Sequence, residues 1–422
     1  QMKQKIEKTY QRFGFLPLDT PILESAEILL AKAGGETEKQ IYQFKKGDND
    51  IAMRFDLTVP LAKYVAKNYG NLSFPFRRYQ IGKVYRGEKA QKGRFREFYQ
   101  CDIDIIGDGE LSIINDAEIP SVIYNLIKEL GFEDFTIRIN NRKILNGLFE
   151  YINQKDNSTE ILRIIDKIEK IGKDAVIEEL EKIQVSKEAI EKIINFIEIE
   201  GTTDEKLNKL QELNINNETF KLGLDELKNV VYYIRMFGVP DKNFKVDLTI
   251  ARGLDYYTGT VYETFLNNYR ELGSICSGGR YENLAEYYTD KKLPGVGISI
   301  GLTRLFYKLN ELGLIKAEKS SMSDVLVIPM LEDLATPIKI ANALRENEIN
   351  TEIYLNDKKL KAKLKYADKL EIPYTMIIGE DEVNTNIIKV KNMKTGEEKE
   401  AKIFITENKI DVSEIVSIIS HK

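Results

Sequence analysis

Residues 77–96 carry the densest group of side chains that could do chemistry, with eight lysines or arginines and a single acid, Glu88. Fixed cations at this density suit a polyanion, such as a nucleoside triphosphate or a phosphodiester backbone. The alternative is a solvated basic hairpin without a ligand. Asp102 and Asp104 follow closely and, being two residues apart on a strand, face the same side of it. These acids would either keep an edge strand soluble or form the floor of a pocket.

A second group of polar side chains lies at 251–263, where Arg252, Asp255, Tyr256 and Tyr257 are expected on a strand. The pattern is typical either of a binding site or of an ordinary strand with surface aromatics. Glycines recur in the strand-like segments that follow, where they would let a ligand or another backbone approach closely. They are Gly273, Gly278, Gly279, Gly295, Gly297 and Gly301. Their spacing matches neither a GxGxxG dinucleotide fingerprint nor a GxxxxGK[ST] phosphate loop.

The chain is poor in the residues that most metal sites and nucleophilic enzymes use. It has only two cysteines, Cys101 and Cys276, and one histidine, His421. This nearly excludes histidine-ligated metals, cysteine-based zinc sites, disulfide frameworks and Ser-His or Cys-His catalysis. Any catalysis must use carboxylates, arginines, lysines, tyrosines and backbone groups. The net charge is −5, so a nucleic acid would have to bind to local basic patches.

The composition predicts a soluble, cytoplasmic protein of several domains. Of its 422 residues, 42% are hydrophobic and 31% are charged, which is typical of globular proteins. No stretch of ~18 uncharged apolar residues would span a membrane. The N-terminus is charged and lacks the apolar core of a secretory signal peptide. At ~100–200 residues per domain, about two to four domains are expected.

Several short elements must position these groups. Hydrophobic periodicity and punctuation by Gly and Pro predict helices at 3–14, 22–33 and 59–69, and strands at 41–44 and 51–57. Segment 76–106 predicts two strands closed by a long polar loop. Further strands are expected at 246–265, 273–281 and 294–306, and the last six or so residues of that final segment should be helical.

The composition shifts at about residue 142 and suggests five parts. They are a first part of the core at 1–141, a mostly helical insertion at 142–240, a second part of the core at 241–315, a linker at 316–323 and an α/β domain at 324–422. Within the insertion, isoleucines keep helical spacing, and Thr202 with Glu205 predicts a capping box.

Strand and helix patterns alternate beyond residue 324, which predicts a small α/β domain with a largely parallel sheet and a hairpin around 394–396. Its helix at 358–371 is rich in lysine. Leu360, Leu364 and Ala367 should pack inward while the lysines face outward, either to solvent alone or to phosphates.

Taken in order, these segments resemble class II aminoacyl-tRNA synthetases, and histidyl-tRNA synthetases closely. FLPLDTPILE, with Pro21, looks like motif 1, the dimer-interface segment. VYRGEKAQKGRFREF looks like motif 2, and GVGISIGLTRLF like motif 3. The histidine-specific marks are ARGLDYYTG, SGGRYENL and FYQCDID, and KYADKLEIPYTMIIGEDE resembles the anticodon-binding domain. The resemblance implies an α+β fold: an antiparallel-sheet catalytic core with a helical insertion, followed by a small α/β anticodon-binding domain, in a homodimer.

The resemblance also implies an activity and its participants. ATP, with Mg²⁺, would activate L-histidine, which is then transferred to histidine tRNA. Arg86 and Arg252 would flank the α-phosphate, where charge develops, and Arg304 would hold the γ-phosphate near the adenine. Glu88 would meet the adenine amino group, and Arg94 would reach the phosphates or the tRNA end. The metal ligands stay open.

The implied histidine pocket reads an ammonium group and an imidazole. Asp56, Thr58 and Gln100 match the ammonium-binding positions, and Asp104 matches the acid that faces the imidazole. The tyrosines beside it are Tyr256, Tyr257 and Tyr281, and Arg252 also borders this pocket. Buried partners of this kind reject substrates that lack matching groups by ~10⁴–10⁵-fold.

Two other functions remain open, and one residue departs from the family pattern. The first is the non-catalytic, synthetase-like regulatory subunit of ATP phosphoribosyltransferase, which lacks the anticodon-binding domain and tends to lose the RGLDYY signature. The second is an RNA-binding protein without activity. The presence of Arg86, Arg252 and Arg304 together favours the enzyme. Thr303 stands where Glu is common before the motif 3 arginine.

Overall fold

The computed structural model describes residues 1–30, 38–89, 93–250, 256–315, 320–405 and 410–420. The chain divides into two compact units, Gln1–Leu314 and Ile315–Lys422. Within the described residues, no helix is both long and apolar enough to span a membrane.

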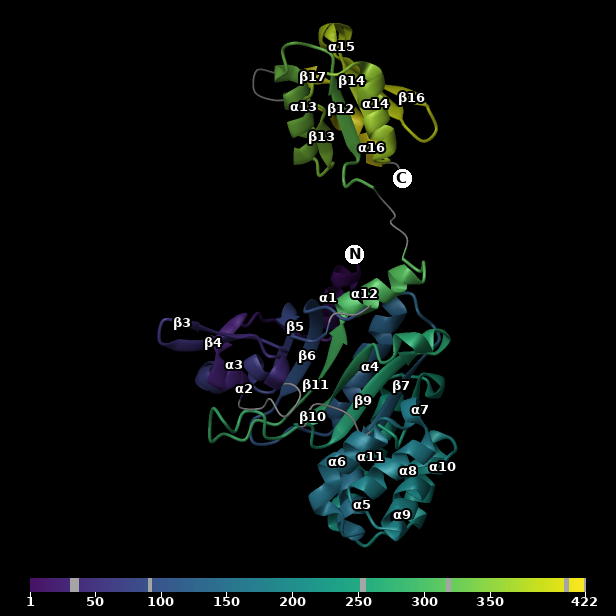
Figure 1. Cartoon of the computed structure of the whole chain (residues 1–422). Coiled ribbons are helices and arrows are strands. Elements are labelled where there is room, and N and C mark those ends of the chain that lie inside the picture. The colour runs from purple at the N-terminus through teal and green to yellow at the C-terminus, as the bar shows by residue number, and fades with distance from the viewer. Residues whose placement is uncertain (31–37, 90–92, 251–255, 316–319, 406–409, 421–422) are drawn as a thin grey trace. The chain divides into compact units, whose positions relative to one another are not determined.

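A large sheet forms the centre of the first unit (Figure 1). In the described residues it has eight strands in the order β1-β5-β6-β11-β10-β9-β7-β8. The outer pairs β1–β5 and β7–β8 are parallel, and all the pairs between them are antiparallel. The strands are β1 Leu16–Pro17, β5 Phe76–Tyr85, β6 Glu97–Ile106, β11 Gly295–Gly301, β10 Cys276–Tyr281, β9 Thr260–Leu266, β7 Phe135–Asn141 and β8 Phe244–Val246.

Strand β6 lies in the interior of this sheet, between β5 and β11. The predicted pair of strands in 76–106 is confirmed, whereas the idea that Asp102 and Asp104 solubilise an edge strand is wrong. One face of β6 carries apolar side chains, such as Ile103, against the helices behind the sheet. There Tyr10 of α1 (Met2–Arg12) donates a hydrogen bond to the Cys101 carbonyl, 3.1 Å away, and α4 (Ile114–Glu129) packs against β11. The acids therefore occupy the opposite face of the sheet.

A small three-stranded sheet, in the order β2-β4-β3, borders the site. Its strands are β2 Leu23–Ser25, β3 Gln43–Lys46 and β4 Asn49–Met53, and the helices beside it are α2 Ala26–Leu30 and α3 Thr58–Asn68. The helix predicted from residue 22 is wrong at its start, because Leu23–Ser25 pairs with Ile51–Met53. Pairing with a distant strand overrides local helix propensity there.

The described elements between Arg142 and Met236 are all helical. They are α5 Arg142–Tyr151, α6 Ser158–Ile165, α7 Ile168–Ile171, α8 Lys173–Lys182, α9 Lys187–Ile197, α10 Thr203–Glu212 and α11 Glu218–Met236, with a short 3₁₀ turn at Lys155–Asn157. The predicted capping box is present. Thr202 Oγ1 accepts from the Glu205 N–H at 3.3 Å, and a Glu205 carboxylate oxygen accepts from the Thr202 N–H at 2.7 Å.

The strand predicted at 246–265 is interrupted, and this prediction is therefore wrong. Strands β8 and β9 lie on opposite sides of β7, β8 parallel to it and β9 antiparallel to it. The chain must leave one side of β7 and return on the other, so no single strand can connect them. Tyr256 and Tyr257 consequently lie in the connection, outside any strand. Arg252 and Asp255 fall outside the described residues.

The second unit has a mixed sheet flanked by helices (Figure 1). Its described strands follow the order β13-β12-β14-β15-β16, namely Thr351–Ile353, Val325–Pro329, Tyr374–Ile378, Ile387–Asn392 and Glu398–Lys402. The first three are parallel, but β15 and β16 are antiparallel, so the sheet is less parallel than predicted. Helices α13 (Ala335–Glu346) and α16 (Ser413–Ser420) cover one face, and α14 (Leu360–Lys369) covers the other. The remaining elements are α15 Glu380–Thr385 and the short pair β17 Phe404–Ile405 and β18 Ile410–Asp411.

One lysine of α14 contradicts the prediction that its lysines face outward. Leu360, Leu364 and Ala367 pack inward as expected. Lys363, however, is only 6% exposed, and its ammonium group donates to the Pro329 carbonyl at 2.7 Å. It lies on the same side of the helix as the apolar residues, because positions 360, 363, 364 and 367 follow the helical repeat.

Candidate active site

Aligned residues form polar rows across the open face of the large sheet. The register places Gln80, Asp102, Ser299, Ser277 and Glu263 opposite one another on β5, β6, β11, β10 and β9. In the next row Arg78 lies opposite Asp104, which in turn lies opposite Gly297 and then Gly279. Small residues on β11 and β10 thus leave space above the carboxylates of β6.

A first cavity of about 300 Å³ opens above these rows. Asp104 at its floor is 2% exposed. The Tyr281 hydroxyl donates to Asp104 Oδ1 at 2.9 Å, and Arg78 Nη2 lies 2.6 Å from Oδ2. Gly295 allows this arrangement, since a side chain there would collide with the Tyr281 ring. The residues that line the cavity include Asp56, Thr58, Gln100, Asp102, Asp104, Tyr256, Tyr257 and Tyr281.

Burial shifts the titration of the three acids in this cavity. It raises the pKa of Asp56 and of Asp104 to about 6, and that of Asp102 to about 7. Arg78 opposes the shift for Asp102 and Asp104, and the Val59 N–H, which donates to Asp56 Oδ1 at 3.1 Å, opposes it for Asp56. These carboxyl groups therefore titrate close to neutral pH, and a cationic ligand in the cavity would favour their ionised forms.

The connection that carries the tyrosines is fixed by the first residue of α5. Arg142 Nη1 donates to the Tyr257 carbonyl at 3.0 Å, and the Arg142 N–H donates to the Gly259 carbonyl at 2.9 Å. The rings of Tyr256 and Tyr257 meet edge to face with centroids 4.9 Å apart, and Tyr256 meets Tyr281 at 6.1 Å. These contacts hold the aromatic wall of the first cavity in place.

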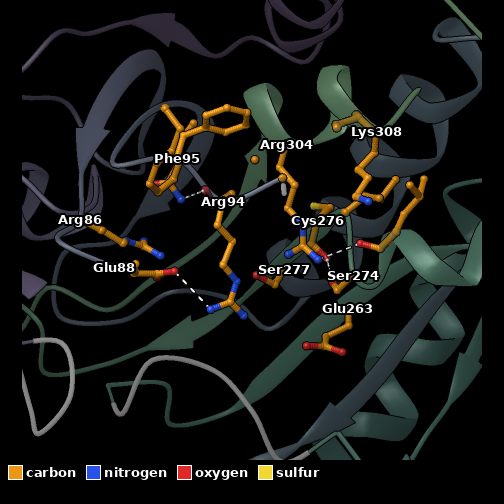
Figure 2. Close-up of a pocket in the computed structure, with 18 residues that line it drawn as sticks. Arg86, Glu88, Arg94, Phe95, Glu263, Ser274, Cys276, Ser277, Arg304 and Lys308 are labelled. Atoms are coloured by element: carbon orange, nitrogen blue, oxygen red, sulfur yellow. Dashed lines mark hydrogen bonds and ion pairs between the residues drawn. The ribbon is translucent and has the colours of Figure 1, made fainter. Parts of the chain in front are cut away.

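A second cavity, of about 370 Å³, is rich in cationic side chains (Figure 2). Arg86, Arg94, Arg304 and Lys308 line it together with Glu88, which pairs with Arg94 at 3.3 Å. Arg86 is held by its Nε donating to the Phe55 carbonyl at 3.0 Å and by the Phe98 ring, 5.2 Å from its guanidinium carbon. Arg304 Nη2 donates to the Leu272 carbonyl at 2.9 Å. Burial and the nearby positive charge of Arg94 lower the Arg304 pKa. An anion bound in this cavity would offset that repulsion between cations.

The two cavities share part of their walls, namely Arg86, Gln100, Glu263, Ser277 and Ser299. Gln100 Nε2 donates to Ser299 Oγ at 2.8 Å and so fixes part of this shared wall. A small cationic molecule in the first cavity would therefore lie next to a polyphosphate in the second. The arrangement suits attack on a phosphorus atom by a group of the small molecule, with arginine at the developing charge.

The structure brings the described candidate residues of the sequence analysis into these two cavities. Arg86, Glu88, Arg94 and Arg304 line the second cavity, and Arg86 also borders the first. Asp56, Thr58, Gln100, Asp104, Tyr256, Tyr257 and Tyr281 line the first. Thr303, which departs from the family pattern, accepts a hydrogen bond from the Tyr99 N–H at 2.8 Å.

Sequence reasoning missed Arg78, Ser277, Ser299 and Glu263, and left Asp102 without a role. A signal for Arg78 existed, because the hairpin register of 76–106 would place it opposite Asp104. Glu263, Ser277 and Ser299 had no such signal, since their alignment depends on pairing between segments far apart in the chain.

Comparisons with known proteins agree on one family. The model of histidyl-tRNA synthetase matches residues 1–305, and that of the anticodon binding domain matches residues 324–422. The histidine–tRNA ligase of Clostridium tetani is 63% identical over 399 residues, which cover 94% of this chain and 91% of that protein. The ligase of Finegoldia magna is 50% identical over 398 residues, covering 94% and 92%. The crystal structure of histidyl-tRNA synthetase from Nostoc sp. PCC 7120 superimposes with a TM-score of 0.86 at 39% identity, covering 99% of this chain and 94% of that one.

Proposed function

Because the chain belongs to the histidyl-tRNA synthetase family, we propose that its joined cavities form histidyl-adenylate from histidine and ATP. The chain is a histidine–tRNA ligase, an ATP-dependent enzyme that joins histidine to its tRNA. The observation that carries the assignment of the site is the shared wall between an acidic cavity and a basic one.

Histidine occupies the first cavity in this proposal. Its ammonium group is bound by Asp56, Thr58 and Gln100, and its imidazole faces Asp104, with Tyr256, Tyr257 and Tyr281 around it. The burial of Asp104 and its contacts with Tyr281 and Arg78 support this role, because they hold the carboxylate in one orientation. A fixed, desolvated acceptor discriminates strongly against side chains without a matching donor.

ATP occupies the second cavity. A histidine carboxylate oxygen bonds to the α-phosphorus while the bond from that phosphorus to the bridging oxygen breaks, and pyrophosphate leaves with the electron pair. Arg86 and Arg252 stabilise the charge on the α-phosphate oxygens, Arg304 binds the γ-phosphate, and Glu88 and Arg94 border the nucleotide. The step needs no side-chain nucleophile and no proton transfer, in agreement with the clustered arginines of the cavity.

Magnesium accompanies ATP in this proposal. Among the described residues, no group of three or more His, Cys, Asp or Glu side chains is placed to hold a metal ion. Mg²⁺ commonly binds through substrate phosphates with one or two carboxylates, so a dedicated cage is not required. Glu263, which lines both cavities, is a carboxylate that fits this role. The ion would supply charge neutralisation at the phosphates.

The remaining assignments concern assembly and tRNA. We propose that residues 324–422, beyond a linker at 316–323, bind the anticodon of histidine tRNA, as the anticodon-binding model suggests. Residues 142–240 form an insertion between the two parts of the core, 1–141 and 241–315. The enzyme acts as a homodimer through the segment around Pro21, and works in the cytoplasm.

Histidine-dependent exchange of pyrophosphate into ATP tests this function. The ligase should exchange pyrophosphate into ATP only when histidine is present, and it should attach histidine to histidine tRNA. A folded protein that does neither would be the non-catalytic regulatory subunit or an RNA-binding protein. A protein that exchanges pyrophosphate with a different amino acid would show that the first cavity has been misassigned.

A further inference from the structure

Asp102 is a buried carboxylate in the first cavity that the proposed function does not use. It is 2% exposed and belongs to the same face of β6 as Gln100 and Asp104. Among the described residues, its Oδ1 has no hydrogen-bond partner. Leaving a buried charged oxygen unpaired costs free energy, so a ligand that supplies a donor there would bind with a large gain.

The neighbours of Asp102 leave room for such a ligand. Ser299 lies opposite it on β11, Ser277 follows on β10, and Gly297 lies opposite Asp104. Residues two apart on a strand have Cα atoms about 6.7 Å apart. One imidazole ring with a charge-assisted hydrogen bond of about 2.8 Å at each nitrogen can bridge that span.

The charges of the cavity favour a cationic ring. Asp56, Asp102 and Asp104 all lie close enough to Arg78, which is fully buried, for its charge to lower their pKa values. Among the described residues, Arg78 forms its ion pair with Asp104, where Nη2 lies 2.6 Å from Oδ2, and not with Asp102. The α-ammonium group of histidine compensates Asp56 in the proposed function. Asp56, Asp102, Asp104 and Glu263 then stand against Arg78, Arg86 and the ammonium group, which leaves one negative charge for the side chain of the substrate to balance.

We propose that Asp102 binds the second ring nitrogen of histidine, so that the side chain is held as an imidazolium ion between Asp102 and Asp104. The inference rests on the proposed function and deepens it, because it assigns the protonation state of the bound substrate. Asp102 thereby determines specificity for a ring that can carry two N–H groups.

The other groups that face Asp102 leave this assignment intact. The charged ones in the described residues are Arg78 and Arg86 at β5, Asp56 before α3, Asp104 on β6 and Glu263 on β9. The neutral ones are Tyr10 on α1, Cys101 on β6, Tyr257, and Tyr281 and Cys276 on β10, and burial raises the pKa of each. They remain protonated at neutral pH, so the ring and the carboxylates alone exchange protons there.

Histidine affinity against pH, measured by calorimetry on the full-length enzyme, tests the proposal. The complex holds one proton between the ring and Asp102. The wild-type Kd for histidine should therefore rise about tenfold per pH unit above pH 7, where the free ring, with a pKa near 6.5, and the free Asp102, with a pKa of about 7, have both lost their protons. Asp102→Asn should weaken binding at pH 6.5 by roughly 10- to 150-fold, the scale of a hydrogen bond to a charged group. The variant should also lose most of the rise in Kd between pH 7 and 8.

A matched control and a substrate analogue complete the test. Glu118→Gln removes a carboxylate that pairs with Arg77 at 2.9 Å and that lies outside both cavities. This variant should show the wild-type dependence of the histidine Kd on pH. Triazolylalanine, whose ring is uncharged at neutral pH, should bind the wild-type enzyme far more weakly than histidine, and Asp102→Asn should narrow that difference. The analogue experiment on the wild-type enzyme does not depend on the folding of any variant.

Two results would overturn the proposal. One is equal binding of triazolylalanine and histidine by the wild-type enzyme. The other is a folded Asp102→Asn variant with an unchanged Kd and pH profile. If Asp104→Asn still abolishes histidine binding in that case, the proposed function stands while the role of Asp102 falls.

Discussion

Gly297 of β11 lies directly opposite Asp104 of β6, and a Cβ atom at position 297 would collide with Asp104 Oδ1 and with the Ile103 carbonyl oxygen. The absence of a side chain at this point is what opens the first cavity above the acid. Gly297→Ala should therefore raise the KM for histidine much more than the KM for ATP, and should lower the Tm. Pyrophosphate-exchange kinetics and thermal melts check this.

Gly301→Ala is the control for the stability of the same strand. The nearest atom to a Cβ at position 301 is 3.9 Å away, so this variant should keep the wild-type Tm. Equal effects of Gly297→Ala on both KM values would contradict the placement of histidine above Asp104.

Asp104→Ala should raise the KM for histidine far more than that for ATP. The substitution removes the acceptor held by Tyr281 and also leaves Arg78, which is fully buried, without its closest partner. Steady-state exchange at varied concentrations of each substrate measures the difference. If both constants change alike in a folded variant, Asp104 supports the structure rather than binds the side chain.

Arg252→Ala should reduce histidine activation by roughly 10²–10³ or more, which is the scale for losing a fixed donor at developing charge. Single-turnover formation of the adenylate isolates this step from tRNA charging. The circular dichroism spectrum of the variant should match that of the wild type. Near-normal adenylate formation by the folded variant would remove Arg252 from the catalytic set.

Exposed lysines on α14 should contact tRNA, whereas the buried one should not. Replacing Lys361 and Lys365 with Ala should weaken tRNA binding and flatten its log–log salt dependence by up to ~0.7–0.9 per lost phosphate contact. Lys363→Ala should instead lower stability by about 1–3 kcal/mol, because it removes the bond to the Pro329 carbonyl. An unchanged salt slope in the double variant would place the tRNA contacts on another face of the second unit.

Protonation of the three site acids should make the ligand-free enzyme more stable at mildly acidic pH than at pH 7.5. Burial raises the pKa of Asp56 and Asp104 to about 6 and that of Asp102 to about 7, so the folded state holds their protons more tightly than the unfolded state. Their contribution is full below the unfolded pKa, near 3.9, and is lost as pH rises through 6–7. Melts of wild type and Asp102→Asn from pH 5 to 8 should show a smaller decline in the variant. An identical decline would mean that other groups govern it.

Local signals were enough to predict some elements, while long-range pairing decided the others. The hairpin in 76–106, the capping box at Thr202 and the strand–helix alternation beyond residue 324 each depend on residues close in sequence. The separation of β8 from β9 depends on both strands pairing with β7, which no local pattern records. The burial of Lys363 depends on the position of the Pro329 carbonyl, more than thirty residues away.

The candidate site divides in the same manner. The resemblance to synthetases located Asp104 and Arg86 through short motifs around them. The polar row that joins the two cavities could not be predicted from the sequence, because Asp102 is aligned with Ser299 and Glu263 only by the order of the strands in the sheet. The orientation of Tyr257 likewise comes from Arg142, over a hundred residues earlier in the chain.

Arg142 has a practical consequence for protein engineering. It is at once the first residue of α5 and the donor that holds the Tyr257 carbonyl. A chimaera that exchanges the helical segment with that of a relative by cutting in front of α5 would also replace this donor. Junctions placed after the first turn of α5 would transplant the outer helices and leave the tyrosine-bearing connection anchored.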